Sequence, residues 1–228
     1  MLFQELKHDI YRKISKLKWK LSCRKDEIVD FDVYSIYLGH HKVTYCGVEA
    51  IRCPFDYLIY QMIISEIKPD LVIEIGTNKG GGALYIADLM NNLGHGAVHT
   101  IDIIDAHDPL IDKHPRITTF LNGWQQYDLY EAKNASKVLV IEDSSHHYDN
   151  TMAVLQKFAE VVTPGSYLIV EDGIVNELGM TKKYDGGPLR AINEFLRNHP
   201  EFIVDKNWSN LFGHNATFNV KGYLYKQQ

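Results

Sequence analysis

Residues 70–82 read DLVIEIGTNKGGG. A short apolar run that leads into a glycine-rich stretch is typical of a buried parallel strand that turns sharply into a helix. We therefore predict a strand at 71–75 and a helix at 81–93. The glycines would let a ligand approach the backbone of the turn between them. In an open α/β sheet, such a turn lies at the edge where ligands bind.

The rest of the chain repeats this alternation. Further strands are predicted at 98–103, 117–121, 138–141 and 167–170, with helices at 55–67, 150–161 and 188–198. Apolar strands that alternate with helices form a parallel sheet covered on both faces. The last two strands, 202–205 and 222–225, have no predicted helix between them and indicate an antiparallel hairpin. The pattern predicts a doubly wound, mostly parallel seven-stranded α/β sheet of the class I methyltransferase type.

The first 44 residues are predicted to form an N-terminal helical extension, followed by one domain at 45–228. Residues 2–21 have the periodicity of an amphipathic helix, with basic residues between Phe3, Leu6, Ile10, Ile14, Leu17 and Leu21. We favour packing of this apolar stripe on the domain or on a second subunit, which makes a homo-oligomer the expected assembly. The alternative is docking to an anionic membrane surface.

Composition excludes several classes of protein. The 228 residues are 45% hydrophobic and carry a formal net charge of −5, so a general nucleic-acid binder is not expected. The three cysteines have no metal-type spacing and are predicted to be reduced thiols. Neither a signal peptide nor the ~20 consecutive apolar residues of a membrane span is present. We predict a cytoplasmic protein.

The glycine turn and the end of the second strand predict a nucleoside site. The turn supplies Glu74, Gly76, Thr77 and Gly80, and the next helix would favour a ligand carboxylate at its N-terminus. Asp102 ends the second strand, where an acid can accept hydrogen bonds from ribose hydroxyls. A dinucleotide fingerprint requires a second glycine where Asn78 stands, which argues against NAD.

Acids also follow the fourth and fifth strands. Asp143 follows one strand, and Glu171 and Asp172 follow the next. Adjacent parallel strands would bring the three carboxylates together, and such a cluster needs a cation to be neutralised. Oxygen ligands suit Mg²⁺ or Mn²⁺. We predict that these three residues bind a metal ion and that Asp143 also borders the cofactor.

His146 is the predicted general base. It lies three residues after Asp143, one turn along if the segment is helical, and an imidazole is a natural acceptor of a hydroxyl proton. His147 is its competitor for this role. The remaining histidines have no comparable setting, and we interpret them as surface or core residues; they include His40, His41 and His107.

Taken together, these residues resemble the cephalosporin hydroxylase family of methyltransferase-fold proteins, from about Tyr45 onward. The resemblance is carried by PDLVIEIGT (69–77), DSSH (143–146), GSYLIVED (165–172) and GP (187–188). It implies S-adenosylmethionine and Mg²⁺ as cofactors, and the family is similar to rhamnosyl and macrolide-sugar O-methyltransferases. Catechol O-methyltransferase-like enzymes are similar too: they place an Asp and an acid–amide pair with the separation of Asp143 and Glu171, and a basic Lys at the position of His146.

Two departures from these patterns are visible. Asp172 replaces the amide, which makes the site more anionic. Arg52 stands where relatives carry Lys. The function expected is transfer of a methyl group from S-adenosylmethionine to a hydroxyl of a small molecule or glycan. The alternatives are a nicotinamide oxidoreductase, which leaves the three acids unexplained, and a non-catalytic accessory protein of a hydroxylase or glycan pathway that keeps the fold.

Overall fold

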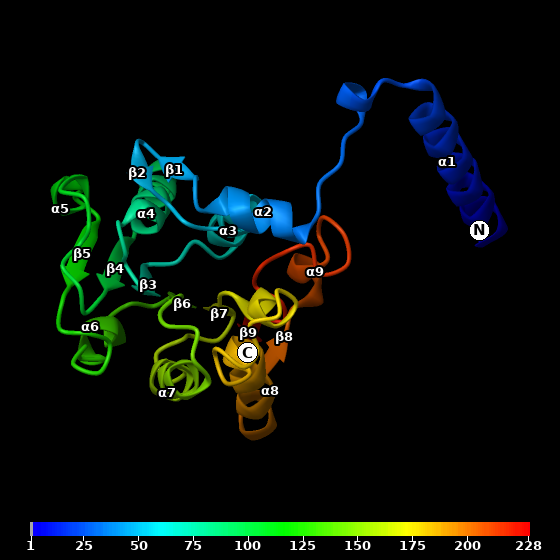
Figure 1. Cartoon of the computed structure of the whole chain (residues 1–228). Coiled ribbons are helices and arrows are strands. Elements are labelled where there is room, and N and C mark those ends of the chain that lie inside the picture. Colours follow the sequence, from blue (N-terminus) through cyan, green and yellow to red (C-terminus); the bar gives the residue numbers. More distant parts are fainter. Residues whose placement is uncertain (1) are drawn as a thin grey trace. The chain divides into compact units, whose positions relative to one another are not determined.

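The computed structural model describes the backbone of residues 2–228 and the side chains of all of these except residues 2–9 and 25. The chain divides into two compact units, residues 1–36 and residues 37–228. Figure 1 shows the elements of both units.

The first unit contains the predicted amphipathic helix. Helix α1 spans Leu2–Ser22, and a 3-10 turn, η1, follows at Lys25–Glu27. The side chains of Phe3 and Leu6 lie outside the described residues. The described remainder of the apolar stripe is exposed: Ile10, Ile14, Leu17 and Leu21. Nowhere in residues 2–228 does the structure contain a helix with the length and apolarity needed to cross a bilayer.

The second unit is built on a seven-stranded sheet (Figure 1). The strand order is β5-β4-β3-β6-β7-β9-β8, and β3 to β7 are parallel. Strands β9 and β8 are antiparallel to their neighbours. The bounds are β3 Leu71–Ile75, β4 Ala97–Ile101, β5 Ile117–Phe120, β6 Val138–Glu142, β7 Tyr167–Val170, β8 Phe202–Val204 and β9 Tyr223–Lys226.

This topology confirms the predicted fold and changes one detail. All seven strands lie within a few residues of their predicted positions. The last strand, β9, inserts between β7 and β8, so it pairs with both neighbours. A short helix, α9 (Lys206–Ser209), interrupts the connection between β8 and β9, where no helix was predicted. Its four residues are too few for the helical period to be visible in the sequence.

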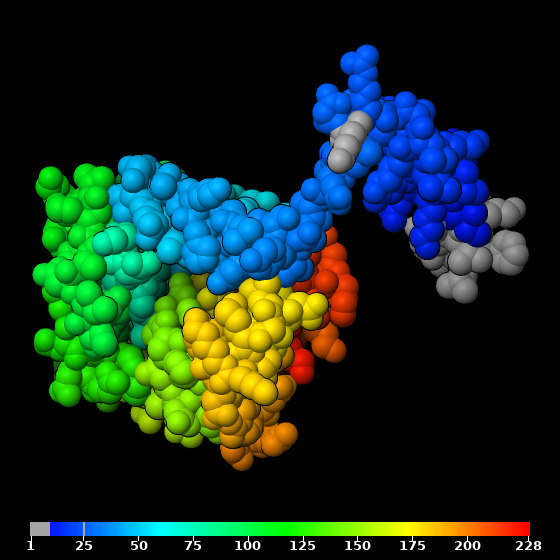
Figure 2. Space-filling view, viewed as in Figure 1, coloured from blue at the N-terminus to red at the C-terminus, as the bar shows by residue number. Residues whose placement is uncertain are grey.

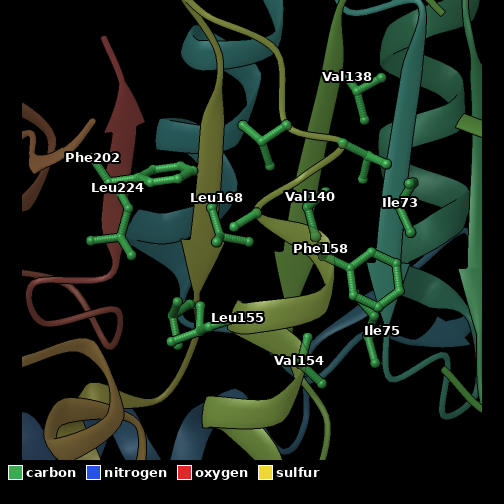
Figure 3. Close-up of a cluster of buried hydrophobic side chains, with 14 of the residues drawn as sticks. Ile73, Ile75, Val138, Val140, Val154, Leu155, Phe158, Leu168, Phe202 and Leu224 are labelled. Carbon is green, nitrogen blue, oxygen red and sulfur yellow. The ribbon is translucent and has the colours of Figure 1, made fainter. Parts of the chain in front are cut away.

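Alternation along the strands gives the sheet a separate core on each face. Odd-numbered residues of β3 pack with α7 (Tyr148–Phe158) and α8 (Gly187–Asn198). Even-numbered Val72 faces α3 (Pro54–Ile67) and α4 (Gly81–Leu93) on the other side. Figure 3 shows the first core, in which Val154, Leu155 and Phe158 of α7 face the strand side chains. Helices on both faces leave the carboxyl edge of the sheet free for a site.

The helix boundaries have local causes. Pro54 at the start of α3 has a φ suited to the first turn, and Lys68 ends it in a left-handed conformation before Pro69. Helix α4 is bounded by Gly80 and Gly94, both left-handed. The other short elements are α5 Leu110–Lys113, α6 Tyr130–Lys133 and η2 Gly173–Asn176.

The segment between residues 26 and 54 contains short elements that the sequence pattern did not predict individually. It contains α2 (Val33–His40) and a hairpin of β1 (Thr44–Tyr45) and β2 (Val48–Glu49). The hairpin is attached to α4 by a hydrogen bond of 2.9 Å from the Tyr45 hydroxyl to Asp88. This contact brings the following residues, 49–52, to the carboxyl edge of the sheet.

Candidate active site

A cavity of about 540 Å³ lies at the carboxyl ends of β3, β4, β6 and β7. This is the switch point of the sheet, because β3 connects to β4 on one side and pairs with β6 on the other. Most of the residues predicted from the sequence line it: Glu74, Gly76, Thr77, Asp102, Asp143, His146, Glu171 and Asp172. Gly80 does not line the cavity and instead forms the N-terminal boundary of α4.

The glycine turn allows two strand ends to touch. Gly76 has a φ of 109°, and a Cβ built on it would lie 2.0 Å from the carbonyl oxygen of Asp143. Only glycine can hold this conformation at so close an approach. The next residue, Thr77, is buried and shares a hydrogen bond of 2.7 Å with Thr100 of β4. The turn is therefore held against both neighbouring strands.

Asp102 lies beside this turn, as predicted. Its carboxylate accepts a hydrogen bond of 2.9 Å from the backbone N–H of Asn78 and bonds of 2.7 and 3.1 Å from the N–H groups of Ile103 and Ile104. These bonds orient the carboxylate at the cavity wall. An acid in this position is suited to accept hydrogen bonds from ribose hydroxyls.

A loop that the sequence did not single out closes the same end of the cavity. Gly123, Trp124 and Gln125 line it. The ammonium group of Lys157 in α7 donates to three carbonyl oxygens of this loop, those of Trp124, Gln125 and Tyr127, at 2.8 to 3.0 Å. The Trp124 indole donates to Asn150 at 3.1 Å. Trp124 and Lys157 are far apart in the sequence and form no motif. Their role in holding this loop was therefore not predictable from the sequence pattern.

Arg52 enters the acid cluster from the segment after β2. Its Nη2 atom lies 2.7 Å from a Glu171 oxygen, 3.3 Å from Glu74 and 3.6 Å from Asp143. Its Nε atom donates to the same Glu171 oxygen at 2.8 Å, and Tyr60 donates to that oxygen at 2.7 Å. Arg52 is 3% exposed, so its charge is compensated inside the protein. The sequence showed Arg52 only as a departure from relatives.

The predicted acids are thus brought to one place, but they are not equivalent. The compact group of donor atoms consists of Asp143, His146 and Asp172, whose ligand atoms all lie within 4.8 Å of one another. Glu171 is turned toward Arg52 and Tyr60. Its second oxygen, Oε2, keeps one longer contact of 3.2 Å to Arg52 Nε. One Glu171 oxygen is therefore committed to the protein, and the other has capacity for a further partner.

His146 reaches this group through a loop and not through a helix turn. Helix α7 begins two residues later, at Tyr148, and His146 has a φ of 58°. Histidine tolerates this left-handed conformation better than most residues. The Nε2 atom lies 3.3 Å from an oxygen of Asp172. His147 is exposed and does not line the cavity. The structure therefore separates the two histidines that the sequence left in competition.

The electrostatics of the cluster follow from burial and crowding. Burial and the nearby Glu171 carboxylate raise the pKa of Asp143 well above its ordinary value. The same two causes raise the pKa of Asp172 to about 7, although about a quarter of its side chain faces the cavity. Burial lowers the pKa of His146 to about 4, so at neutral pH the imidazole is uncharged. Carboxylates that resist ionisation together are the setting in which a cation is bound.

These residues fit a divalent ion. Asp143 and Asp172 offer oxygen atoms of the type that Mg²⁺ and Mn²⁺ prefer, and Glu171 Oε2 has capacity for a further partner. Arg52 supplies a single positive charge to the three acids it contacts, Glu74, Asp143 and Glu171. This single charge cannot balance three ionised carboxylates, so a bound cation would favour their ionised forms.

One part of the cavity lining, which we call the aromatic wall, is rich in aromatic rings. The end of α2 with the residue after it, and the segment after β7, contribute Tyr37, His40, His41, Met180 and Tyr184. Figure 2 shows these two parts of the chain next to each other, the first in light blue and the second in yellow. The Tyr184 ring has edge contacts to the His146 and His147 rings. His40 is buried and His41 exposed, as the sequence predicted for core and surface histidines, and both also line the cavity.

Comparison with known proteins agrees with the resemblance. The sequence profile of the rhamnosyl O-methyltransferase/CmcI family matches residues 38–227. The chain belongs to this family. A rhamnosyl O-methyltransferase of Mycobacterium tuberculosis H37Rv is 27% identical over 231 residues, covering 95% of this chain and 93% of the relative. The Mycobacterium leprae protein of the same name is 28% identical over 215 residues, covering 90% and 93%.

Solved structures confirm the fold. A structure described as "cmcI-D160 Mg-SAM" is 19% identical with a TM-score of 0.63, covering 92% of this chain and 84% of its own. The O-methyltransferase TomG from Streptomyces achromogenes, solved in complex with SAM, is 13% identical with a TM-score of 0.52, covering 89% and 93%. The predicted methyltransferase architecture is therefore confirmed.

Proposed function

We propose that this protein transfers a methyl group from S-adenosylmethionine to a hydroxyl of a sugar or natural product, with a divalent metal ion. Its family and its relatives named rhamnosyl O-methyltransferase support the reaction class. The observation that carries the proposal is the meeting of Asp143, His146 and Asp172 with the glycine turn in one cavity. The proposed cofactor-binding residues would therefore be adjacent to the proposed metal ligands and base.

The cofactor would occupy the end of the cavity near β3 and β4. Asp102 would accept hydrogen bonds from the ribose, and the backbone at Gly76 and Thr77 would border the methionine portion. Gly80 would contribute through the start of α4, while Glu74 and Asp143 lie at the inner wall. Asn78 occupies the position of a fingerprint glycine, which favours this cofactor over NAD.

The metal ligands that we propose are Asp143, Asp172 and the Oε2 atom of Glu171. A bound Mg²⁺ or Mn²⁺ would lower the pKa of the acceptor hydroxyl. Asp143 and Asp172 follow adjacent strands, so the sheet itself fixes their separation. Arg52 and Tyr60 hold the other Glu171 oxygen, which limits the rotation of that carboxylate.

His146 is the proposed general base. Its uncharged imidazole can take the proton of the acceptor hydroxyl, and Asp172 lies 3.3 Å from its Nε2 atom to stabilise the imidazolium that forms. The methyl group would then pass from the sulfonium sulfur to the oxygen in a single displacement. Alignment of oxygen, carbon and sulfur by the two cavity walls would supply a large part of the rate.

The acceptor would lie against the aromatic wall that includes Tyr37 and Tyr184. Hydroxyls of a sugar could face the acids while its apolar ring face meets the aromatic side. Relatives named rhamnosyl O-methyltransferase make a deoxysugar our first choice of acceptor. The cytoplasmic location, homo-oligomer and membrane contact expected from the sequence stay predictions.

Mass spectrometry of reaction mixtures tests the proposal. Rhamnosides and other sugar glycosides would be incubated with S-adenosylmethionine, enzyme and Mg²⁺. We expect a product heavier by one methylene unit, formed together with S-adenosylhomocysteine. Cofactor binding without methyl transfer to any hydroxyl acceptor would favour the accessory-protein alternative. Absence of cofactor binding would contradict the proposal outright.

A further inference from the structure

One nitrogen of Arg52 has no hydrogen-bond partner among the described residues, although the guanidinium lies over the Tyr57 and Tyr60 rings. The Nε and Nη2 atoms bind Glu171 and Glu74, but Nη1 is buried and makes no hydrogen bond to any described residue. A buried guanidinium N–H without an acceptor is costly, so native proteins almost always satisfy such groups. Because Arg52 lines the cavity, the missing acceptor is expected to come from a ligand.

The position of Nη1 indicates where that ligand group lies. A Cβ built on Gly82 would be 2.7 Å from a Glu74 oxygen and 3.1 Å from Nη1. Gly81 and Gly82 form the first turn of α4, and both line the cavity. The N–H groups of a first helical turn have no partners within the helix, and they favour an anion. Nη1 therefore lies beside the first turn of α4, close to the Glu74 carboxylate.

The charges of the cavity-lining residues further restrict which ligand group can bind at Nη1. Among the described cavity-lining residues, Arg52 is the only arginine or lysine. Six carboxylates line the same cavity: Glu49, Glu74, Asp102, Asp143, Glu171 and Asp172. An anionic group of a ligand would be attracted to the Arg52 side of such a cavity, whereas a cationic group would be attracted to any of the carboxylates.

S-adenosylmethionine has this distribution of charge, with a sulfonium and an ammonium group and a single carboxylate. We propose that Arg52, through Nη1 together with the N-terminus of α4, binds the α-carboxylate of the cofactor's methionine portion. This assignment rests on the proposed function. It also gives Arg52 two roles at once, since its Nε and Nη2 atoms hold Glu171 while Nη1 holds the cofactor.

Calorimetry with three ligands tests the assignment in the presence of EDTA, so that no metal contributes. The ligands are S-adenosylmethionine, its decarboxylated form, and methylthioadenosine, which lacks the amino acid portion. The wild-type protein should prefer S-adenosylmethionine over the decarboxylated form by roughly ten- to a hundredfold, the effect of a charge-assisted hydrogen bond. In Arg52→Gln this preference should fall to within a few-fold of unity.

Controls separate the role of Arg52 from a loss of folding. Arg52→Gln should bind methylthioadenosine with affinity close to that of the wild type. If Arg52→Gln does not fold, Arg52→Lys takes its place, because lysine keeps a positive charge near Glu171. This variant should lose part of the preference for S-adenosylmethionine over its decarboxylated form. Lys79→Gln removes the same charge from an exposed position in the glycine turn and should keep the full preference.

Two results would overturn the inference. One is an unchanged preference for S-adenosylmethionine in folded Arg52→Gln or Arg52→Lys. The other is a wild-type protein that binds S-adenosylmethionine and its decarboxylated form equally well. Failure of the wild type to bind any of the three ligands would instead contradict the proposed function itself.

Discussion

The carbonyl oxygen of Asp143 occupies the space into which any side chain at Gly76 would extend, with only 2.0 Å between that oxygen and a Cβ built on Gly76. This close approach brings the turn after β3, the proposed cofactor side, against the segment after β6 that carries the proposed metal ligand Asp143. The two halves of the proposed site are therefore packed together at this point. The relationship explains why a glycine is required here and predicts what happens when it is replaced.

Gly76→Ala should lower the free energy of unfolding by several kcal/mol and weaken cofactor binding. The new methyl group would combine an unfavourable φ with a backbone clash, and each such strain costs roughly 1–3 kcal/mol. Gly94→Ala is the matched control, because Gly94 also has a positive φ but has nothing within 4 Å of its Cβ position. Urea denaturation should show a loss of about 1 kcal/mol there. Equal losses in both variants would contradict the steric explanation.

Asp102→Ala should weaken binding of S-adenosylhomocysteine by about ten- to a hundredfold. The substitution removes charge-assisted hydrogen bonds to ribose worth roughly 1.5–3 kcal/mol. Asp105→Ala, which removes a nearby exposed carboxylate, serves as the control and should bind normally. Calorimetry measures both. Unchanged affinity in Asp102→Ala would refute its assignment to the ribose.

Asp56 should make stability depend on pH. Burial raises the pKa of Asp56 to about 7, even though Thr217, Tyr223 and the Phe218 N–H donate to its carboxylate. The folded protein therefore holds this proton more tightly than the unfolded chain does. The resulting stabilisation is present below pH 4 and is lost as pH rises to about 7, by up to about 1.4 kcal/mol per pH unit.

Denaturation of the wild type and Asp56→Asn between pH 4 and pH 8 checks this. The stability of the wild type relative to the variant should fall with increasing pH and level off above pH 7. Parallel curves for the two proteins would show that Asp56 does not titrate differently on folding.

The sequence predicted the sheet well because its signals are local. The buried run at β3 and the glycines around α4 place both elements without tertiary information. The hairpin of β1 and β2 was missed because each strand has two residues, too few for a visible period, and it depends on the long-range bond from Tyr45 to Asp88. Tertiary contacts of this kind leave no periodic trace in the sequence.

The sequence indicated many residues of the candidate site but not which of their side chains contact one another. Strand ends indicated which acids meet, because parallel strands end at one edge. The ion pair between Arg52 and Glu171 joins residues that are 119 positions apart in the sequence, and no spacing rule connects them. The aromatic wall near His40 and His41 was missed for the same reason. It depends on how α2 is positioned over the segment after β7, which a single sequence does not reveal.

Metal removal should stop turnover without stopping cofactor binding. The proposed ion contacts Asp143, Glu171 and Asp172, whereas the nucleoside contacts lie near Asp102 and the glycine turn. EDTA should therefore reduce methyl transfer to background, and added Mg²⁺ or Mn²⁺ should restore it. Binding of S-adenosylhomocysteine measured in EDTA should be nearly unchanged. A full rate of turnover in chelated enzyme would remove the metal from the proposal.

The central claim is that His146 takes the acceptor's proton, and kcat of His146→Asn tests it most directly. Asparagine accepts the left-handed conformation of this position but is not a base at neutral pH. With saturating Mg²⁺ and cofactor, kcat should fall by roughly 10²–10⁴-fold. His147→Asn, at the exposed neighbouring histidine, should retain kcat within a few-fold of the wild type. A kcat near the wild-type value in His146→Asn, or a larger loss in His147→Asn, would contradict the account.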